Sequence, residues 1–346
     1  MTCTLAFAIP GDIATLTGGF IYERRLLEGL RRAGHDVLHV VLPASFPDPS
    51  PADMAAAVAA LADAAPDRPL ILDGLVFGAI DTDGLARVRA PVVAMIHHPL
   101  ALETGLAPER RDHLFRTERD NLRLARHVLV PSPHTRRILT DRYDVAPQAI
   151  TVLRPGVDRP RLPPAPAMPP LILSVGILHP RKGHDILIGA LSRLADLDWQ
   201  AVIVGNPWDR DHAAALERQR AASPVARRIT LAGKVSADEL EALYARASVF
   251  ALATWYEGHG IVFDEALVRG LPIVSCHAGA VPDTVPQGAG LLVPPGDAVA
   301  FADALRGLIG DPGRRRTMAD AALAAGAGLP DWQQMADRAS RVLSRL

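Results

Sequence analysis

The sequence predicts an α/β protein built from two parallel β-sheets, each with helices on both faces. Short apolar runs of strand length alternate with amphipathic segments of helical length along the whole chain. This alternation is typical of strand–helix–strand units, whose strands run parallel. A proline-rich stretch divides the pattern into two series, and a chain of 346 residues is long enough for two domains of this kind.

The first series of strands fills the N-terminal half of the chain. Its first strand is expected at residues 5–9 and leads to a helix at 20–33, which ends at Gly34. The other strands of this series are expected at 36–42, 70–73, 92–96, 127–130 and 150–153.

The second series follows a stiff connector. Residues 154–170 contain seven prolines, which exclude a helix or a central strand there. We therefore expect an N-terminal domain at 1–158, a C-terminal domain at 159–330, and a last helix at 331–346 that crosses back to the first domain. Strands of the second domain are expected at 171–175, 201–204, 229–231, 249–253, 272–275 and 290–293.

The strand pattern also predicts where a ligand binds. In open α/β sheets ligands lie at the carboxyl ends of the strands. We therefore expect two doubly wound, Rossmann-like domains that face each other across a cleft, with one ligand between them.

The composition excludes several classes of function. The net charge is −1, which argues against nucleic acid or an anionic membrane as a partner. Cys3 and Cys276 are the only cysteines, too few for a disulfide framework or a zinc site. The N-terminus shows no basic leader, and no apolar stretch approaches the roughly 18 residues of a membrane span. We expect a cytoplasmic enzyme, and its oligomeric state is not indicated.

The most informative segment lies between the expected strand at 249–253 and a helix at 261–269. Glu257 and Glu265 bracket a glycine-containing turn at the start of that helix. The free N–H groups and the positive end of a helix make such a turn suitable for an anion such as phosphate. Both glutamates are placed to reach one molecule bound there.

Other motifs accompany this pair in a fixed order. They are Gly18-Gly19, the segment 154–158, Gly176 with the His-Pro-Arg-Lys-Gly segment at 179–183, and the segments 278–283 and 290–294. Together with the two glutamates, spaced as E-x7-E, they resemble the motifs of the family 4 GT-B glycosyltransferases. These are retaining enzymes that use nucleotide sugars, and the resemblance covers nearly the whole chain.

The sequence departs from this family's pattern at four positions. Ile177 stands where many members carry arginine, so Arg181 is expected to supply that charge. His259 replaces a common aromatic residue, Asp264 is unusual beside the second glutamate, and Ala280 stands where glycine is frequent. These departures bear on the prediction of which donor is used more than on the prediction of the reaction class.

The resemblance implies a role for each matching residue. Arg181 and Lys182 stabilise the leaving diphosphate; Lys182 is one of only two lysines among 37 basic residues. Glu257 contacts the hydroxyls of the donor sugar, Glu265 contacts the ribose, and Val235 lies near the base. His97 points at the donor sugar. The remaining donor-binding positions are Gly18, Gly19, Gly258, His259, Gly260 and Ile261. The glycine pair is expected in the loop before the first helix, where a side chain would block the approach of phosphate.

The acceptor is predicted only in outline. Tyr22 is a candidate contact because its ring could stack on a sugar, and His98, Glu103 and Thr104 are candidates because they follow the strand expected at 92–96. A small soluble acceptor is favoured over a lipid-linked one, because no basic amphipathic helix is evident. For the donor, a UDP-sugar is favoured and a GDP-sugar comes next.

No metal or other cofactor is expected besides the nucleotide sugar. The Asp-Thr-Asp segment at 81–83 and the Asp-Arg-Asp segment at 209–211 look like D-x-D metal motifs. Both precede expected helices, where aspartate is favoured as a cap, so we interpret them as caps.

Two other classes of function remain open. One is a related GT-B epimerase that hydrolyses its nucleotide sugar, with His97 and Glu103 as acid and base. The product anomer and the need for an acceptor separate it from a transferase. The other is a non-catalytic module that binds the donor without turnover, which the intact glutamate pair and Arg181-Lys182 disfavour.

Overall fold

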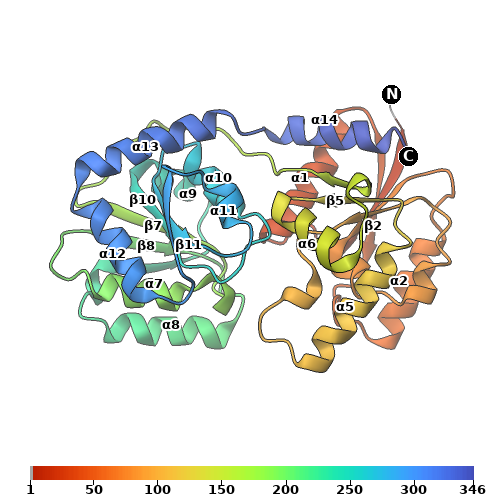
Figure 1. The fold of residues 1–346 in the computed structure, drawn as a ribbon, viewed down its shortest axis with the longest axis horizontal. Helices are drawn as coiled ribbons and strands as arrows, with labels where there is room; N and C mark the ends of the chain where they lie inside the picture. Colours follow the sequence, from red (N-terminus) through yellow and green to blue (C-terminus); the bar gives the residue numbers. More distant parts are fainter. Residues whose placement is uncertain (1–2) are drawn as a thin grey trace. The chain divides into compact units, whose positions relative to one another are not determined.

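The computed structural model describes residues 3–346, which form two compact units. Unit 1 contains the chain up to Gly156 together with Pro330–Leu346, and unit 2 contains Val157–Leu329. The expected N-terminal domain begins at residue 1, and its first two residues lie outside the described part. Each unit holds one six-stranded sheet in which every strand pair is parallel (Figure 1). The predicted architecture of two parallel sheets is confirmed.

Unit 1 contains the six strands predicted for the first series. Their order in the sheet is β2-β1-β3-β4-β5-β6, so β1 lies between β2 and β3. The direction of winding therefore reverses beside β1, which is where such sheets form a ligand crevice. The strands are β1 (Thr4–Pro10), β2 (Asp36–Leu42), β3 (Leu70–Asp73), β4 (Val92–Met95), β5 (His127–Val130) and β6 (Ile150–Val152).

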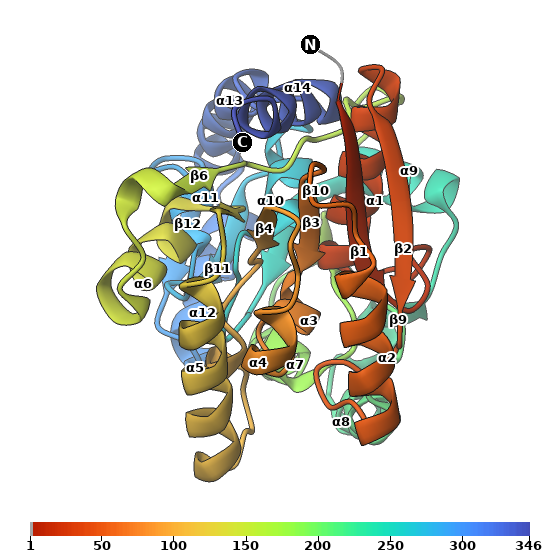
Figure 2. The same cartoon turned by 90° about the vertical axis from the view of Figure 1, so that its right-hand side faces the viewer.

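Helices lie against this sheet, as Figure 2 shows for α1 and α2 beside β1 and β2. The C-terminal helix α14 packs on α1 at close range, because a Cβ added to Gly29 would lie 2.5 Å from the Cβ of Ala336. The helical elements are α1 (Gly18–Arg32), α2 (Pro51–Ala62), α3 (Gly74–Phe77), α4 (Thr82–Leu85), η1 (Leu100–Leu102), α5 (Pro108–Leu122), α6 (Pro133–Tyr143), η2 (Pro147–Ala149) and α14 (Trp332–Leu343).

The start of α1 corrects one expectation. Gly18 and Gly19 are the first two residues of this helix and do not lie in the preceding loop. The reason is Thr17, whose side chain accepts a hydrogen bond from the Phe20 N–H at 3.5 Å and so caps the helix two residues earlier than expected.

Unit 2 repeats the design with the order β12-β11-β10-β7-β8-β9. Its strands are β7 (Leu171–Val175), β8 (Gln200–Val204), β9 (Ile229–Gly233), β10 (Ala247–Leu252), β11 (Ile273–Cys276) and β12 (Gly290–Val293). Its helices are η3 (Pro180–Lys182), α7 (His184–Ser192), α8 (Arg210–Ala222), η4 (Ala226–Arg228), α9 (Ala237–Arg246), α10 (Ile261–Leu267), α11 (Val281–Thr284), α12 (Ala298–Ile309) and α13 (Pro312–Ala327).

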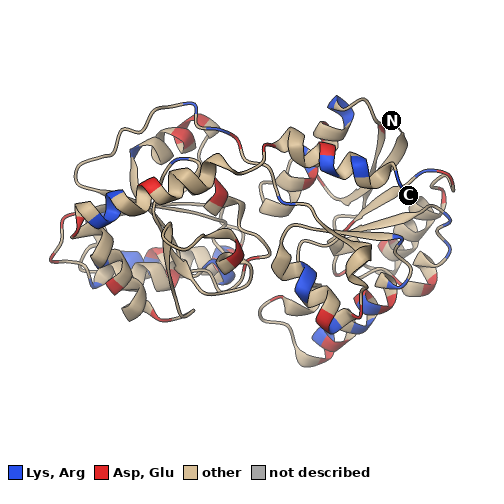
Figure 3. Cartoon of the chain, turned by 45° about the horizontal axis from the view of Figure 1, so that its top comes forward, with Lys and Arg blue, Asp and Glu red and all other residues tan. Residues whose placement is uncertain are grey.

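The sequence of the central strand β10 is mostly apolar because both faces of the strand are buried. Val249 and Ala251 belong to the core on one face of the sheet, whereas Phe250 and Leu252 belong to the core on the opposite face. Charged residues of both signs are instead spread over the helices and loops (Figure 3).

The proline-rich connector is tied to unit 2 beyond its first residues. The Arg159 guanidinium donates hydrogen bonds to the carbonyls of Gly326 and Leu329, at 2.8 and 2.7 Å. The N–H groups of Arg161 and Leu162 both donate to one oxygen of Glu241. Among the described residues, no helix is both long and apolar enough to cross a bilayer.

Candidate active site

Several predicted donor-binding residues gather at one edge of the unit 2 sheet. Because the strands are parallel, their carboxyl ends share that edge. Arg181 and Lys182 lie in η3, which follows β7, and Glu257 follows β10, the strand beside β7. Val235 follows β9, the outermost strand of the sheet, and packs partly against the core.

Glu257 is the centre of this group. Its carboxylate is buried, and its Oε1 lies 2.6 Å from the Lys182 Nζ. Its Oε2 lies 3.9 Å from the Arg181 guanidinium, and the Thr254 hydroxyl lies 3.0 Å from Oε1. Burial raises the pKa of Glu257, but the charges of Lys182 and Arg181 and the hydrogen bonds from Lys182 and Thr254 together outweigh burial and hold the pKa below its usual value. Glu257 is therefore a charged carboxylate inside the protein.

The loops that carry these side chains are fixed by close backbone contacts. Gly183 has a φ of +62°, and a Cβ there would lie 2.0 Å from the carbonyl oxygen of Ala253. Gly279 has a φ of +54°, and a Cβ there would lie 2.4 Å from the carbonyl oxygen of Glu257. The same carbonyl accepts a hydrogen bond from the Ala280 N–H at 2.8 Å. Only glycine fits these two positions, so the loops of β7 and β11 hold the end of β10 from both sides.

Two departures from the family's pattern prove to be partners. The ring Nε2 of His259 lies 2.6 Å from the carboxylate of Asp264, and both side chains are buried. The Thr284 hydroxyl donates to the His259 carbonyl at 2.8 Å, so the turn from Gly258 to Ile261 is held on two sides. Gly260, with a φ of +88°, lets the chain enter α10. This helix ends at Leu267 and not at residue 269 as expected.

Glu265 lies on α10 and contacts a residue that the sequence did not suggest. The Tyr244 hydroxyl donates to its Oε2 at 2.7 Å. Burial raises the pKa of Glu265, although the bond from Tyr244 opposes this shift. Thr254 and Tyr244 have no linear motif, and only their place after β10 and on α9 brings them to the two glutamates.

Unit 1 has its own group at the carboxyl edge of its sheet. His97 follows β4, and Gly19 on α1 lies against its ring: a Cβ added there would be 3.5 Å from Cδ2. A Cβ added to Gly18 would have no atom within 4 Å. Behind His97 lie Glu23 of α1 and Asp73 at the end of β3, two buried carboxyl groups that the sequence did not single out.

The candidate acceptor contacts occupy different environments. His98 Nε2 lies 3.0 Å from Glu103 Oε2, so these two form a pair, and the exposed Thr104 follows directly. Tyr22 is buried, and its hydroxyl donates to the Leu153 carbonyl at 2.7 Å. Its ring packs edge-on against His97, so in this structure Tyr22 supports that ring from inside.

The two D-x-D segments are helix caps, as predicted. Asp81 accepts a hydrogen bond from the Gly84 N–H, and Asp209 accepts one from the His212 N–H, both at 2.9 Å. Among the described residues, the place where three potential metal ligands meet is the group of Glu23, Asp73 and His97, whose ligand atoms lie within 4.8 Å of one another. Two of these are buried carboxyl groups, and two such groups this close can share a proton.

Comparison with known proteins defines the class. The fold is GT-B: sucrose-phosphate synthase from Thermosynechococcus elongatus superposes with a TM-score of 0.85 at 21% identity, over 100% of this chain and 99% of that one. Anabaena HepE, solved in complex with UDP and glucose, gives a TM-score of 0.77 at 18% identity, over 99% of each chain.

Sequence comparison adds the family. Residues 77–161 match the model described as Glycosyltransferase Family 4, and residues 169–311 match Glycosyl transferases group 1. The chain belongs to this family of glycosyltransferases.

Individual relatives align over shorter stretches. A D-inositol 3-phosphate glycosyltransferase of Salinispora tropica is 31% identical over 52% of this chain and 43% of its own. A GDP-mannose-dependent alpha-(1-6)-phosphatidylinositol monomannoside mannosyltransferase of Mycolicibacterium smegmatis is 33% identical over 49% of this chain and 50% of its own. The chain thus spans about half the length of the curated relatives it matches.

Proposed function

We propose that this chain is a retaining, metal-independent hexosyltransferase that uses a nucleoside diphosphate sugar as its donor. One observation carries the proposal: Arg181 and Lys182 meet the buried, charged carboxylate of Glu257 at the carboxyl edge of the unit 2 sheet. Two cations suit a diphosphate, and a carboxylate fixed beside them suits the hydroxyls of the attached sugar.

The proposed reaction needs no base and no covalent intermediate from the enzyme. The bond from the sugar C1 to the β-phosphate oxygen breaks, and a bond forms from C1 to the acceptor hydroxyl oxygen on the same face. The hydroxyl proton passes to the departing diphosphate. Negative charge grows on that diphosphate as the bond breaks, and Arg181 and Lys182 stabilise it. Glu257 keeps both cations in place and accepts hydrogen bonds from the sugar.

The donor and acceptor are proposed as classes. A UDP-sugar comes first, because HepE of the same fold was solved with UDP, and a GDP-sugar comes next, because one relative is named for GDP-mannose. Inositol phosphates and phosphoinositide glycosides are the first acceptors to test, because the names of two relatives contain them.

A donor screen followed by a transfer assay tests the proposal. UDP- and GDP-sugars are added to the whole protein, and the melting temperature is recorded. A donor at about 100 times its Kd adds roughly 2.7 kcal/mol to the stability of the folded state. The best donor is then incubated with inositol 3-phosphate and related acceptors. We expect an acceptor-dependent glycoside; nucleotide release that is independent of every acceptor would support a hydrolase instead.

The structure does not favour the epimerase alternative. An epimerase would need His97 and Glu103 as an acid–base pair. Glu103 instead pairs with His98, whereas His97 faces Glu23 at 3.4 Å.

A further inference from the structure

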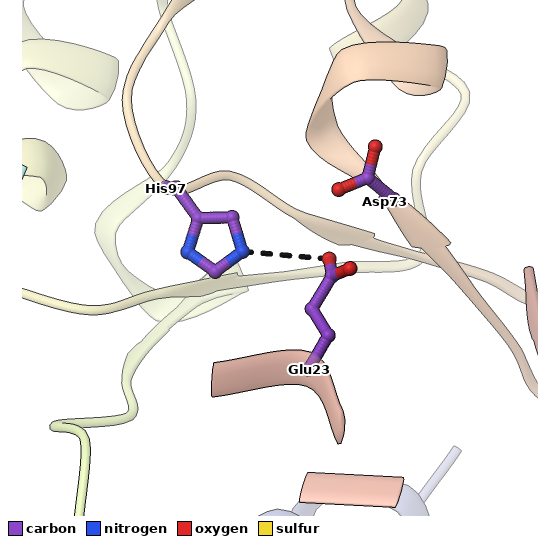
Figure 4. A group of neighbouring side chains, drawn as sticks. All are labelled: Glu23, Asp73 and His97. Atoms are coloured by element: carbon purple, nitrogen blue, oxygen red, sulfur yellow. Dashed lines mark hydrogen bonds and ion pairs between the residues drawn. The ribbon is translucent and has the colours of Figure 1, made fainter. Parts of the chain in front are cut away.

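Three ionisable side chains of unit 1 form a compact group behind the expected sugar-contacting face of His97. Figure 4 shows Glu23 pointing from α1 toward the His97 ring, with Asp73 above it at the end of β3. Glu23 and Asp73 are almost fully buried, at 1% and 3% exposed, whereas the His97 side chain is 23% exposed. The group therefore has a buried acidic end and one imidazole that reaches the surface of unit 1.

The two carboxyl groups require a proton between them. Carboxyl oxygens of Glu23 and Asp73 lie within 4.8 Å of each other in a buried site, and two carboxyl groups this close are favoured there only if at least one carries a proton. Burial raises the pKa of Glu23 to about 7 and holds the pKa of Asp73 well above its usual range. Two adjacent negative charges in a buried site repel strongly, so the pair retains a proton at neutral pH.

His97 presents its two nitrogens to different surroundings. Its Nε2 lies 3.4 Å from Glu23 Oε1, whereas Nδ1 is on the side of the ring that faces away from both carboxyl groups (Figure 4). Burial lowers the pKa of His97, and the opposing effect of Asp73 is smaller, so the neutral ring is favoured. A neutral imidazole carries one proton, and the hydrogen bond made by one nitrogen decides which nitrogen holds it.

The ring is also held in place from the sides. Tyr22 packs edge-on at 5.1 Å between ring centroids, and Gly19 lies against Cδ2. Tyr22 is a further titratable group in contact with the ring. Burial raises its pKa well above the usual value, and its hydroxyl is bonded to the Leu153 carbonyl, so it stays neutral.

We propose that Glu23 and Asp73 are positioning residues which share one proton and hold His97 as the neutral imidazole with its proton on Nε2. Glu23 accepts the Nε2–H bond, and Asp73 keeps Glu23 in place by donating to it. The lone pair of Nδ1 is then presented by unit 1 as a hydrogen-bond acceptor for a hydroxyl of a ligand. This last step rests on the proposed function, whereas the state of the ring does not.

The direct test is ¹⁵N NMR of the whole protein labelled at histidine, without any ligand. A His97→Gln spectrum assigns the signals, and the shifts of protonated and unprotonated ring nitrogens report the tautomer. At pH 8 we expect a protonated Nε2 and an unprotonated Nδ1. In Glu23→Gln, whose amide can donate or accept at Nε2, this preference is expected to be lost. An Nδ1-protonated ring or an imidazolium in the parent at pH 8, or the parent tautomer retained in Glu23→Gln, would overturn the proposal.

A control variant, a second variant and a zinc titration complete the test. Glu118→Gln changes another buried carboxyl group of unit 1 and is expected to leave the His97 signals unmoved. If Glu23→Gln does not fold, the parent spectrum and Asp73→Asn decide. Zinc added at one equivalent should not shift the His97 signals, and a stoichiometric shift would assign the group to a metal ion instead.

Kinetics separate this proposal from the proposed function. With a working donor, Glu23→Gln should lower kcat about tenfold, the effect of one lost hydrogen bond, while the affinity for the free nucleoside diphosphate is unchanged. A loss of nucleotide affinity would contradict a role through the sugar. If the tautomer is as expected but no nucleotide sugar is turned over, the positioning of His97 stands and the proposed function fails.

Discussion

At the residue scale, Glu257 carries its charge in a place where little water remains to stabilise it. Lys182 at 2.6 Å and the Thr254 hydroxyl at 3.0 Å replace that water. An unpaired buried charge would be strongly destabilising, so the carboxylate and its two cations depend on one another. The arrangement is therefore oriented before any ligand arrives.

We predict that Glu257→Gln reduces turnover far more than nucleotide binding. The amide keeps the shape of the side chain but loses the charge that orients Lys182 and accepts the sugar hydroxyls. A fall in kcat of about 100-fold is expected, with the Kd for free UDP or GDP changed only slightly. The half-exposed Glu217, changed to Gln, serves as the control. An unchanged kcat would remove Glu257 from the site.

Lys182→Ala should lower donor affinity and rate together. The diphosphate is negative both when bound and as it departs, so the missing cation is felt in both states. Lys182→Arg should restore activity only in part, because a planar fork does not occupy the position of a compact ammonium. Titration with the nucleoside diphosphate measures the first effect; an alanine variant with parental affinity would argue against a phosphate contact.

Glu118 gives a pH-dependent prediction that does not depend on function. Burial raises its pKa from 4.5 to about 8, and its Oε2 accepts a hydrogen bond from the Leu100 N–H. Between these two pH values the folded state holds more protons than the unfolded state, so the free energy of unfolding falls as pH rises. Glu118→Gln keeps the acceptor and removes the titration.

We expect the difference in free energy of unfolding between Glu118→Gln and the parent to increase with pH. Relative to the parent, Glu118→Gln should gain roughly 3.5 kcal/mol between pH 5 and pH 8, since each unit of pKa difference is worth about 1.4 kcal/mol. Urea unfolding at a series of pH values measures it. A gap that is constant with pH would contradict the raised pKa.

At the scale of elements, the turn before α10 is held by the contact between His259 and Asp264. His259 and Asp264 are five positions apart, and the turn at Gly260 brings them to 2.6 Å. This contact joins the two residues that the sequence singled out as departures from the family's pattern. It explains two departures in sequence by one contact.

A double-mutant cycle tests this coupling. His259→Phe removes the imidazole that lies 2.6 Å from the buried carboxylate of Asp264 and should destabilise the protein by about 3 kcal/mol. His259→Phe combined with Asp264→Ala removes both groups and should be less destabilised than the first variant. Free energies of unfolding in urea give the coupling energy, and strictly additive effects would mean that the two residues do not act as a pair.

The elements were predictable because their sequence signals are local. All twelve strands were placed from apolar runs, which arise because helices bury both faces of the sheets. The errors lie at the ends of elements: β10 is expected at 249–253 and spans Ala247–Leu252, and two helix ends differ because of local contacts. Thr17 caps α1 early and includes Gly18 and Gly19 in the helix, and α10 stops at Leu267.

At the scale of the whole molecule, the sequence singled out the members of the candidate site that belong to motifs and missed the residues that contact them. Glu257 and Lys182 are 75 positions apart, and the adjacency of β7 and β10 joins them. Glu23 and Asp73 had no signal in the sequence, because their meeting depends on the packing of α1 near the ends of β3 and β4. Buried carboxyl pairs of this kind follow from strand order, which local patterns do not specify.

The central claim is retaining glycosyl transfer without a metal ion, and the product itself tests it most directly. The donor that stabilises the protein is incubated with the best acceptor in excess EDTA, and NMR determines the anomeric configuration of the new glycoside. We predict a product that forms in EDTA and has the same anomeric configuration as the donor. An inverted product, or transfer that stops in EDTA and returns with magnesium or manganese, would contradict the claim.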